Sequence, residues 1–295
     1  MALGLRRLDG QMPVETIGVI GDDEAGRFLS GECDAHGVNH AQLTVVAGES
    51  TLSVDAFCVE SNGRRTHFFH PGVAKLLCPD HFDFAATTAR FLHLGLPGAH
   101  QTMDARWRNE ANGWVATLKA ARANGLETNL ELMTIAPDRL ARLARPLLPH
   151  LDMLVVNDFE IGAVCGVETR RGQGADWAAV KRAMTTAMAL GAMRIVAVHF
   201  PEGALALGRD GVFFAQASLA VPADEIISAN GAGDAFAAGF LYGAHEGWDL
   251  QRALLLGHCA AAASMRAVST TTGVKPWREC VALADLWGFR EKPAL

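Results

Sequence analysis

The sequence lacks the marks of several protein classes. Its 295 residues contain no apolar run near the eighteen or so residues that a membrane span requires, so no membrane partner is expected. No run of basic residues stands out and the formal net charge is −6, so nucleic acid is not an expected partner. The opening ten residues are too few and too charged for a secretory signal peptide. A globular protein with one large domain is therefore expected.

No C-x-x-C pair occurs among the six cysteines, which lie scattered along the chain. Scattered cysteines of this kind are typical of reduced, mostly buried thiols. Reduced thiols in turn predict a cytoplasmic location. The six are Cys33, Cys58, Cys78, Cys165, Cys259 and Cys280.

After Pro79 the chain alternates between strand-like and helix-like segments. Such alternation implies right-handed βαβ units, a mostly parallel sheet and an α/β fold. The predicted strands are 91–96, 128–133, 153–156 and 194–199, with a late hairpin at 204–207 and 212–217. The predicted helices are 103–124, 137–148, 159–164, 176–190, 234–245, 250–266 and 277–287.

The first seventy residues have a different pattern. A helix tail at 2–8, a strand at 14–20 and a helix at 26–36 precede three β-rich stretches, at 43–46, 51–59 and 65–69. Partial alternation and the turn Ser61-Asn62-Gly63 predict hairpins that expose one face. We therefore expect an α/β domain made of residues 1–38 and 71–295, with residues 39–70 inserted as a small β appendage.

The most informative stretch is S-A-N-G-A-G-D-A-F-A-A-G-F at 228–240. Two glycines and an alanine lead into Asp234, which opens a small, apolar helix. Backbone amides gathered at a helix N-terminus form an anion site. The carboxylate there has two interpretations. In the first, its negative charge in the first turn simply suits the helix dipole. In the second, it is a base that takes a proton from a hydroxyl while the amides stabilise the developing phosphoryl charge.

Three polar segments each follow a predicted strand. They are Asn157, His199 and the loop 228–234, and ligands of doubly wound sheets bind beyond the carboxyl ends of the strands. We therefore expect them to converge on one cleft. Asn157 and Glu160 stand three apart at a strand-to-helix junction. They either face a common phosphate site or form an N-cap with a capping-box glutamate.

Two further groups are ambiguous. Asp22, Asp23 and Gly26 either contact a substrate or shape the turn that enters a helix, and the structural role is favoured. His67 and His70 flank two phenylalanines on a strand. Their spacing puts them on opposite faces of a strand, which favours packing or substrate contact over a metal pair.

Together these motifs resemble the ribokinase-like carbohydrate kinases, the PfkB family. The segment N-G-A-G-D-A-F-x-A-G-F is similar to that family's C-terminal signature. V-I-G-D-D-E-A-G at 19–26 is similar to its early G-x-D-x-x-G segment, and V-N-D-F-E at 156–160 to its N-x-x-E motif. The resemblance implies a three-layer α/β/α sandwich in which the β appendage is a substrate lid.

The resemblance also implies transfer of a phosphoryl group from ATP to an alcohol of a sugar or related small molecule. Asp234 would be the base, and the amides of Gly231, Ala232 and Gly233 would form the anion hole. Mg²⁺ would be held by Glu160 and Asn157, mainly through water, because this ion keeps much of its hydration shell. The implied nucleotide-binding positions are Asn157, Glu160, His199, Gly203, Asn230 and Cys259, and the implied substrate contacts are Asp23 and Asp234.

Four departures from the family pattern qualify these roles. The family's usual first strand and G-G-x-x-x-N motif have no counterpart before Ala2, which indicates a late start codon or a shortened paralogue. Ser228 stands where an aspartate commonly helps bind a monovalent cation, so such a cation is doubtful. The nucleotide loop T-x-G-x-x-G is replaced by V-H-F-P-E-G at 198–203. Cys259 replaces an asparagine that often touches the nucleotide.

The leading hypothesis is thus an ATP- and Mg²⁺-dependent sugar kinase. A nucleoside kinase on the same fold is an alternative, and a catalytically weak ligand-binding paralogue is another. Because exposed strand edges seek partners, a homodimer formed through the lid is also expected.

Overall fold

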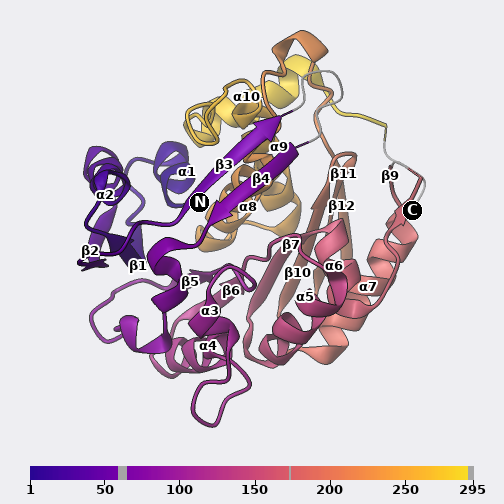
Figure 1. Ribbon diagram of the computed structural model, residues 1–295. Coiled ribbons are helices and arrows are strands. Elements are labelled where there is room, and N and C mark those ends of the chain that lie inside the picture. The colour runs from indigo at the N-terminus through magenta and orange to yellow at the C-terminus, as the bar shows by residue number, and fades with distance from the viewer. Residues whose placement is uncertain (59–64, 173, 292–295) are drawn as a thin grey trace.

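A six-stranded sheet forms the middle of the molecule (Figure 1). The computed structural model describes residues 1–58, 65–172 and 174–291. Four strands are parallel, and two more continue the sheet as an antiparallel hairpin. The prediction of a mostly parallel sheet is therefore confirmed. In sheet order the strands are β12 (Phe213–Ala217), β11 (Gly203–Gly208), β10 (Ile195–Phe200), β7 (Met153–Asn157), β6 (Glu127–Leu130) and β5 (Phe91–Leu94).

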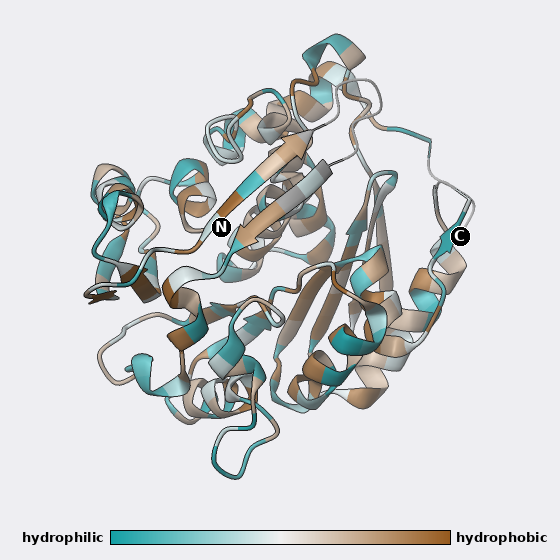
Figure 2. Ribbon diagram, viewed as in Figure 1, coloured by the Kyte–Doolittle hydropathy of each residue, from teal (hydrophilic) through white to brown (hydrophobic). Residues whose placement is uncertain are grey.

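Helices cover both faces of this sheet, as alternate strand residues show. Leu154 and Val156 of β7 belong to the core beneath one set of helices, while Met153 and Val155 belong to the core on the other face. Figure 2 shows hydrophobic residues concentrated on these strands. The three-layer α/β/α sandwich is thus confirmed. One face carries α4 (Gly113–Ala123), α5 (Pro137–Ala144), α6 (Asp158–Cys165) and α7 (Trp177–Leu190), and the other α8 (Ala232–His245) and α9 (Leu250–Ser264), with α10 (Trp277–Trp287) packed on α9.

The N-terminal region adds a second, two-stranded parallel sheet. Within it, β1 (Glu15–Gly21) pairs with β2 (Asn39–Val46), and α1 (Ala2–Leu8) and α2 (Glu24–His36) flank them. β3 (Ser53–Cys58) and β4 (Arg65–His70) form an antiparallel hairpin, drawn apart from the central sheet in Figure 1. Hairpins were expected throughout 42–70. The stretch 43–46 belongs instead to β2, which pairs in parallel with β1, and only β3 and β4 form a hairpin. The predicted turn at 61–63 lies outside the described residues, and the division into a domain and a lid of 39–70 stays a prediction.

The single helix predicted at 103–124 is wrong. The structure has α3 (Gln101–Asp104), a loop, and then α4. Asn112 starts α4, because its side-chain oxygen accepts the Val115 N–H at 3.0 Å and its Nδ2 donates to Leu143 O at 3.1 Å. Helical periodicity alone does not show an N-cap of this kind inside an apolar pattern. Two short strands, β8 (Arg170–Arg171) and β9 (Gly174–Ala175), complete the described elements apart from 3₁₀ turns.

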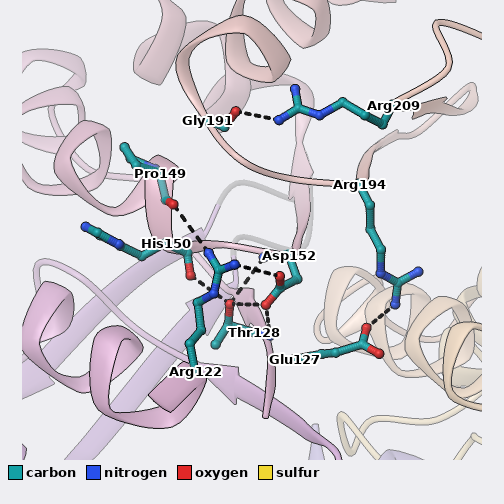
Figure 3. Close-up of polar contacts among 9 residues, drawn as sticks. All are labelled: Arg122, Glu127, Thr128, Pro149, His150, Asp152, Gly191, Arg194 and Arg209. Carbon is teal, nitrogen blue, oxygen red and sulfur yellow. Dashed lines mark hydrogen bonds and ion pairs between the residues drawn. The ribbon is translucent and has the colours of Figure 1, made fainter. Parts of the chain in front are cut away.

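Polar contacts tie the amino ends of the parallel strands together (Figure 3). Asp152, just before β7, accepts hydrogen bonds from Thr128 N and Thr128 Oγ1, each at 2.9 Å. Arg122 lies 3.5 Å from the same carboxylate, and Arg194 pairs with Glu127. These contacts join neighbouring strands at this end of the sheet, whereas ligands of doubly wound sheets bind at the opposite, carboxyl end.

Helix length and the state of the cysteines can be described for the residues that the structure covers. No helix in this part of the chain is both long and apolar enough to cross a membrane. Five of the cysteines are free thiols, as predicted: Cys33, Cys78, Cys165, Cys259 and Cys280. The cytoplasmic location stays a prediction.

The close approach of α8 and α9 depends on glycine. A Cβ added to Gly239 would lie 2.7 Å from Leu256 O, and one added to Gly257 would lie 2.8 Å from the Phe236 ring. The two helices therefore pack almost backbone to backbone, which holds the start of α8 firmly against the sheet.

We predict that Gly239→Ala lowers the free energy of unfolding by about 1–3 kcal/mol, because the added methyl group overpacks the contact with α9. The matched control is Gly31→Ala in exposed α2, where an added Cβ meets nothing within 4 Å. Alanine's better helix propensity should raise stability there by up to about 1 kcal/mol. Denaturant unfolding measures both, and equal stabilisation by the two variants would contradict the close packing.

Candidate functional site

The start of α8 forms the centre of the site. Gly231 is its N-cap with φ 80°, and a Cβ there would also lie 2.7 Å from Thr270 Cβ, so only glycine fits. The next amides, of Ala232, Gly233 and Asp234, belong to the first turn, whose N–H groups have no partner within the helix. The Ala232 N–H donates to Ala229 O at 3.4 Å, and the rest of the turn presents donors and the positive end of the helix dipole, as an anion hole requires.

Asp234 lies in that first turn beside a second carboxyl group. It is exposed to solvent, yet surrounding protein atoms, a hydrogen bond with Glu131 and the Glu131 charge raise its pKa to about 7. Glu131 follows the last residue of β6, and its backbone N–H donates to Leu94 O at 2.8 Å. The sequence analysis did not anticipate this pairing. Its available signal was a charged side chain inside the predicted strand 128–133.

Two more polar residues stand behind Glu131. Nε2 of His93, on β5, lies 2.6 Å from Glu131 Oε2, and His93 Nδ1 lies 2.8 Å from Asn129 Nδ2 on β6. Asn129 is almost fully buried. His93 was missed because it is a single polar residue within the apolar strand β5, and Asn129 because Glu127 and Thr128 beside it on β6 are polar too. Their common signal is that they are paired neighbours on adjacent strands.

Asn157 and Glu160 form a capping box at the start of α6. Asn157 Oδ1 accepts the Glu160 N–H at 2.8 Å, and Glu160 Oε2 accepts the Asn157 N–H at 3.0 Å. The capping interpretation is therefore realised, and a role in phosphate or metal binding stays a prediction. Burial raises the pKa of Glu160 to about 7, with the nearby Glu131 charge acting in the same direction.

The burial and raised pKa of Glu160 fit a hydrated magnesium ion nearby. A cation would offset the free-energy cost of ionising a buried carboxyl group. Asn157 is less suited as a direct ligand, since its side-chain oxygen already caps α6. Within the described part of the chain, no group of three or more His, Cys, Asp or Glu residues is arranged to hold a metal. Binding through water is consistent with that result.

His199 and Gly203 lie at the end of β10 and the start of β11. The centroid of the His199 ring lies 4.8 Å from that of Phe236 with the rings inclined at 34°, and a Cβ on Gly233 would lie 3.1 Å from His199 Cε1. Burial lowers the pKa of His199 to about 4, so the ring is neutral near pH 7. It packs against the backbone of Gly233 in the first turn of α8. Gly203 has a packing role, because a Cβ there would lie 2.6 Å from Gln216 O. Nucleotide contact by either residue stays a prediction.

Asn230 and Cys259 differ in access. Asn230 precedes the anion hole, and its N–H bonds to Ser228 Oγ at 3.1 Å. Cys259 is fully buried in α9, and desolvation raises the pKa of its thiol to about 12. A thiol in that position is neutral and enclosed by other residues, so nucleotide contact by Cys259 is the weakest of the implied roles.

Asp23 lies in a turn and caps α2. Its Oδ1 accepts the Gly26 N–H at 2.9 Å and the Thr51 hydroxyl at 2.6 Å, and its Oδ2 accepts the Thr51 N–H at 2.8 Å. These hydrogen bonds lower its pKa to about 2. The neighbouring Asp22 accepts the Gly48 N–H at 3.1 Å. The favoured structural role thus has its contacts, and substrate contact by Asp23 stays a prediction.

A cavity of about 520 Å³ lies beside this centre, between β1 and β5. Its lining includes the consecutive residues 14–17 and 87–95. Alternate residues of a strand point to opposite faces, so consecutive residues line a cavity only along a strand's edge. The cavity therefore runs between the edges of the two strands. It reaches His93 and Asn129 on one side and the apolar side chains of Met1, Leu5 and Leu241 on the other.

Comparison with known proteins supports the resemblance. The model of the pfkB family carbohydrate kinases matches residues 1–278. An adenosine kinase of Schizosaccharomyces pombe is 28% identical over 127 residues, which make up 42% of this chain and 37% of that protein. The chain thus matches little more than a third of the length of this curated relative.

Solved structures with the same fold cover most of both chains. Arabidopsis thaliana ribokinase, complexed with ribose and ATP, has a TM-score of 0.75, with 19% identity, over 96% of this chain and 84% of that one. An Escherichia coli protein provisionally described as ribokinase II, in complex with ATP and Mg²⁺, gives 0.77 at 19% identity over 96% and 86%. Sinorhizobium meliloti adenosine kinase gives 0.74 at 19% identity over 97% and 80%.

Similarity at such low identity shows the fold alone, whereas the family model extends over nearly the whole sequence. The chain has the ribokinase fold and belongs to the pfkB family of carbohydrate kinases.

Proposed function

We propose that the chain transfers the γ-phosphoryl group of ATP to a hydroxyl group of a sugar or related small molecule. The observation that carries this proposal is the exposed Asp234 carboxyl in the first turn of α8, directly after the amides of Gly231, Ala232 and Gly233. A base and an anion hole on one helical turn suit phosphoryl transfer, which needs mainly positioning and neutralisation of charge.

The proposed reaction uses few protein groups. Asp234, when ionised, accepts the proton of the acceptor hydroxyl. As it does so, the hydroxyl oxygen of the acceptor forms a bond to the γ-phosphorus of ATP. The bond between that phosphorus and the bridging oxygen of ADP breaks, and ADP leaves with the electron pair. The amides before Asp234 donate to the phosphoryl oxygens throughout. Glu160 would hold Mg²⁺ through water, and the ion, when bound, would supply further neutralisation of phosphate charge.

We predict that Asp234→Asn reduces kcat by roughly 10²–10⁴-fold, the range for loss of a general base. Asparagine keeps the size of the side chain but accepts a proton poorly. The matched control is Asp224→Asn, an exposed aspartate in the preceding 3₁₀ turn, which should keep full activity. ADP release with a responsive acceptor measures both variants. A rate near wild type for Asp234→Asn would refute its role as the base.

We also predict that Glu160→Gln raises the Mg²⁺ concentration for half-maximal rate by roughly 10- to 100-fold, the usual cost of changing a group that holds a metal's water ligands. Glutamine keeps the oxygen that accepts the Asn157 N–H, so the capping box and the melting temperature should persist. Glu168→Gln, exposed just beyond the same helix, serves as control. An unchanged Mg²⁺ dependence would remove Glu160 from the metal site.

The acceptor is a sugar or a nucleoside. The Arabidopsis neighbour was solved with ribose, and the Schizosaccharomyces relative is named an adenosine kinase. A panel of sugars and nucleosides, assayed for ADP release, separates the two. Tight binding of ATP in calorimetry without turnover on any acceptor would instead favour a ligand-binding paralogue. That alternative draws support from the buried Cys259 and from Phe200, which packs against Trp177 in the altered loop.

A monovalent cation remains doubtful, because Ser228 Oγ already accepts the Asn230 N–H. A homodimer through the β3–β4 hairpin has better support. Phe57 and Phe68 are each 61% exposed there and stack edge to face at 5.3 Å. Exposed aromatic pairs of this kind are typical of protein interfaces.

We predict a mass twice that of the 31.4 kDa chain in light scattering at micromolar concentration. Phe68→Asp should shift the protein to a monomer, because it places a charge in the contact. Val212→Asp replaces an exposed apolar residue in the turn between β11 and β12, outside the β3–β4 hairpin, and should leave the dimer intact. A monomer mass for the wild-type chain would count against the interface.

A further inference from the structure

Three side chains connect the sheet to Asp234 through hydrogen bonds whose direction is fixed. The chain begins at Val155, whose backbone N–H donates to Asn129 Oδ1 at 3.1 Å. The Asn129 amide is therefore turned so that its Nδ2 faces His93 Nδ1, 2.8 Å away. An amide nitrogen can only donate, so Nδ1 of His93 accepts and carries no proton.

The tautomer of His93 follows from this contact. Its proton lies on Nε2, which donates to Glu131 Oε2 at 2.6 Å. A donated hydrogen bond favours the charged form of a carboxyl group. His93 and Asn129 are register partners on β5 and β6, so the main-chain pairing of the sheet holds the geometry.

Glu131 in turn hydrogen-bonds to Asp234. Two carboxyl groups can do so only if one proton lies between them. Although burial acts in the opposite direction, the hydrogen bonds of Glu131 with His93 and Asp234 lower the pKa of Glu131 to about 2. The proton therefore resides on Asp234, and the pKa of Asp234 is raised.

Other charged groups face the pair from each packed element. The amino group of Met1, on α1, lowers the pKa of both carboxyls, and the Glu160 carboxyl on α6 stands near Glu131. His199 on β10 is neutral near pH 7. Among these groups, Glu131 is the one that hydrogen-bonds directly to Asp234.

We propose that Asn129, His93 and Glu131 are positioning residues that keep a proton on Asp234 and so set the pH range in which it can act as a base. The inference rests on the proposed function, in which ionised Asp234 accepts the acceptor's proton. With the proton retained, Asp234 is inactive, and activity rises as the pair loses that proton. The shared proton leaves to solvent, since Asp234 is exposed.

The first test is the pH profile of kcat/KM. The wild-type profile should have an acid limb centred near pH 7, the raised pKa of Asp234. Glu131→Gln removes the neighbouring charge and should move the limb down by about one pH unit or more. At pH 6 the rate would then rise from about one tenth to about half of its own plateau.

His93→Phe removes the hydrogen bond that favours ionised Glu131, so the carboxyl pair should release its shared proton at higher pH and the limb should move up. The matched control is Glu127→Gln, at the opposite end of β6, which should leave the limb in place. A merely structural role for Glu131 would lower the rate at every pH without moving the limb, and that result overturns the proposal.

The second test needs no activity. Carboxyl ¹³C resonances of the free protein, with nothing added ahead of Met1, report the titration of Asp234 directly. The proposal expects titration near pH 7 in the wild type and at lower pH in Glu131→Gln. If that shift occurs in a protein that phosphorylates no acceptor, the proposed function fails while the positioning chain stands. If Asp234 titrates near pH 4 in the wild type, the proposal fails even in an active kinase.

Discussion

The contact between the Glu131 and Asp234 carboxyl groups is the interaction on which the proposed chemistry of the site depends. It joins the carboxyl end of β6 to the first turn of α8, two elements far apart in sequence. It also places the candidate base where the amides of Gly231, Ala232 and Gly233 gather. Burial acts to raise the pKa of both carboxyl groups, and each pKa shift also has the other carboxyl among its causes.

The surrounding fold keeps this corner in place from two sides. Beneath it, His199 fills the space under Gly233, and the glycine contacts between α8 and α9 hold the helix against the sheet. At the far end of the strands, Thr128 and Asp152 tie β6 to β7. Polar residues at the amino ends of the strands thus stabilise the sheet, whereas polar residues at the carboxyl ends are available to contact a ligand. The contrast follows from the parallel strand arrangement, which collects all carboxyl ends at one edge.

Much of the architecture could be predicted from the sequence, because alternating apolar segments and glycine-rich ends are local signals. The parallel sheet and the three layers followed from them. The break between α3 and α4 did not, because Asn112 acts as a cap through a contact with Leu143 that the local sequence does not show. The parallel pairing of β2 with β1 could not be predicted either, because alternation within a strand does not determine which other strand it pairs with.

The candidate site divides in the same way. The motif around Asp234 could be found from the sequence because it is continuous, and family membership supports the resemblance that it carries, whereas the role of Asp234 as a base stays a prediction. The partners of Asp234 could not be found in this way, because His93, Asn129 and Glu131 are polar residues on two strands and become a set only when those strands pair. Asp23 and Asn157 each had two interpretations, and in both cases the structure supplies the capping contacts.

Phosphorus NMR of the wild-type protein, incubated with ATP, Mg²⁺ and pooled sugars and nucleosides, tests the central claim most directly. The account predicts a new phosphate monoester resonance, coupled to carbon-bound protons of the acceptor, that grows as ATP is converted to ADP. Release of inorganic phosphate alone, or unchanged ATP with every acceptor, would contradict it.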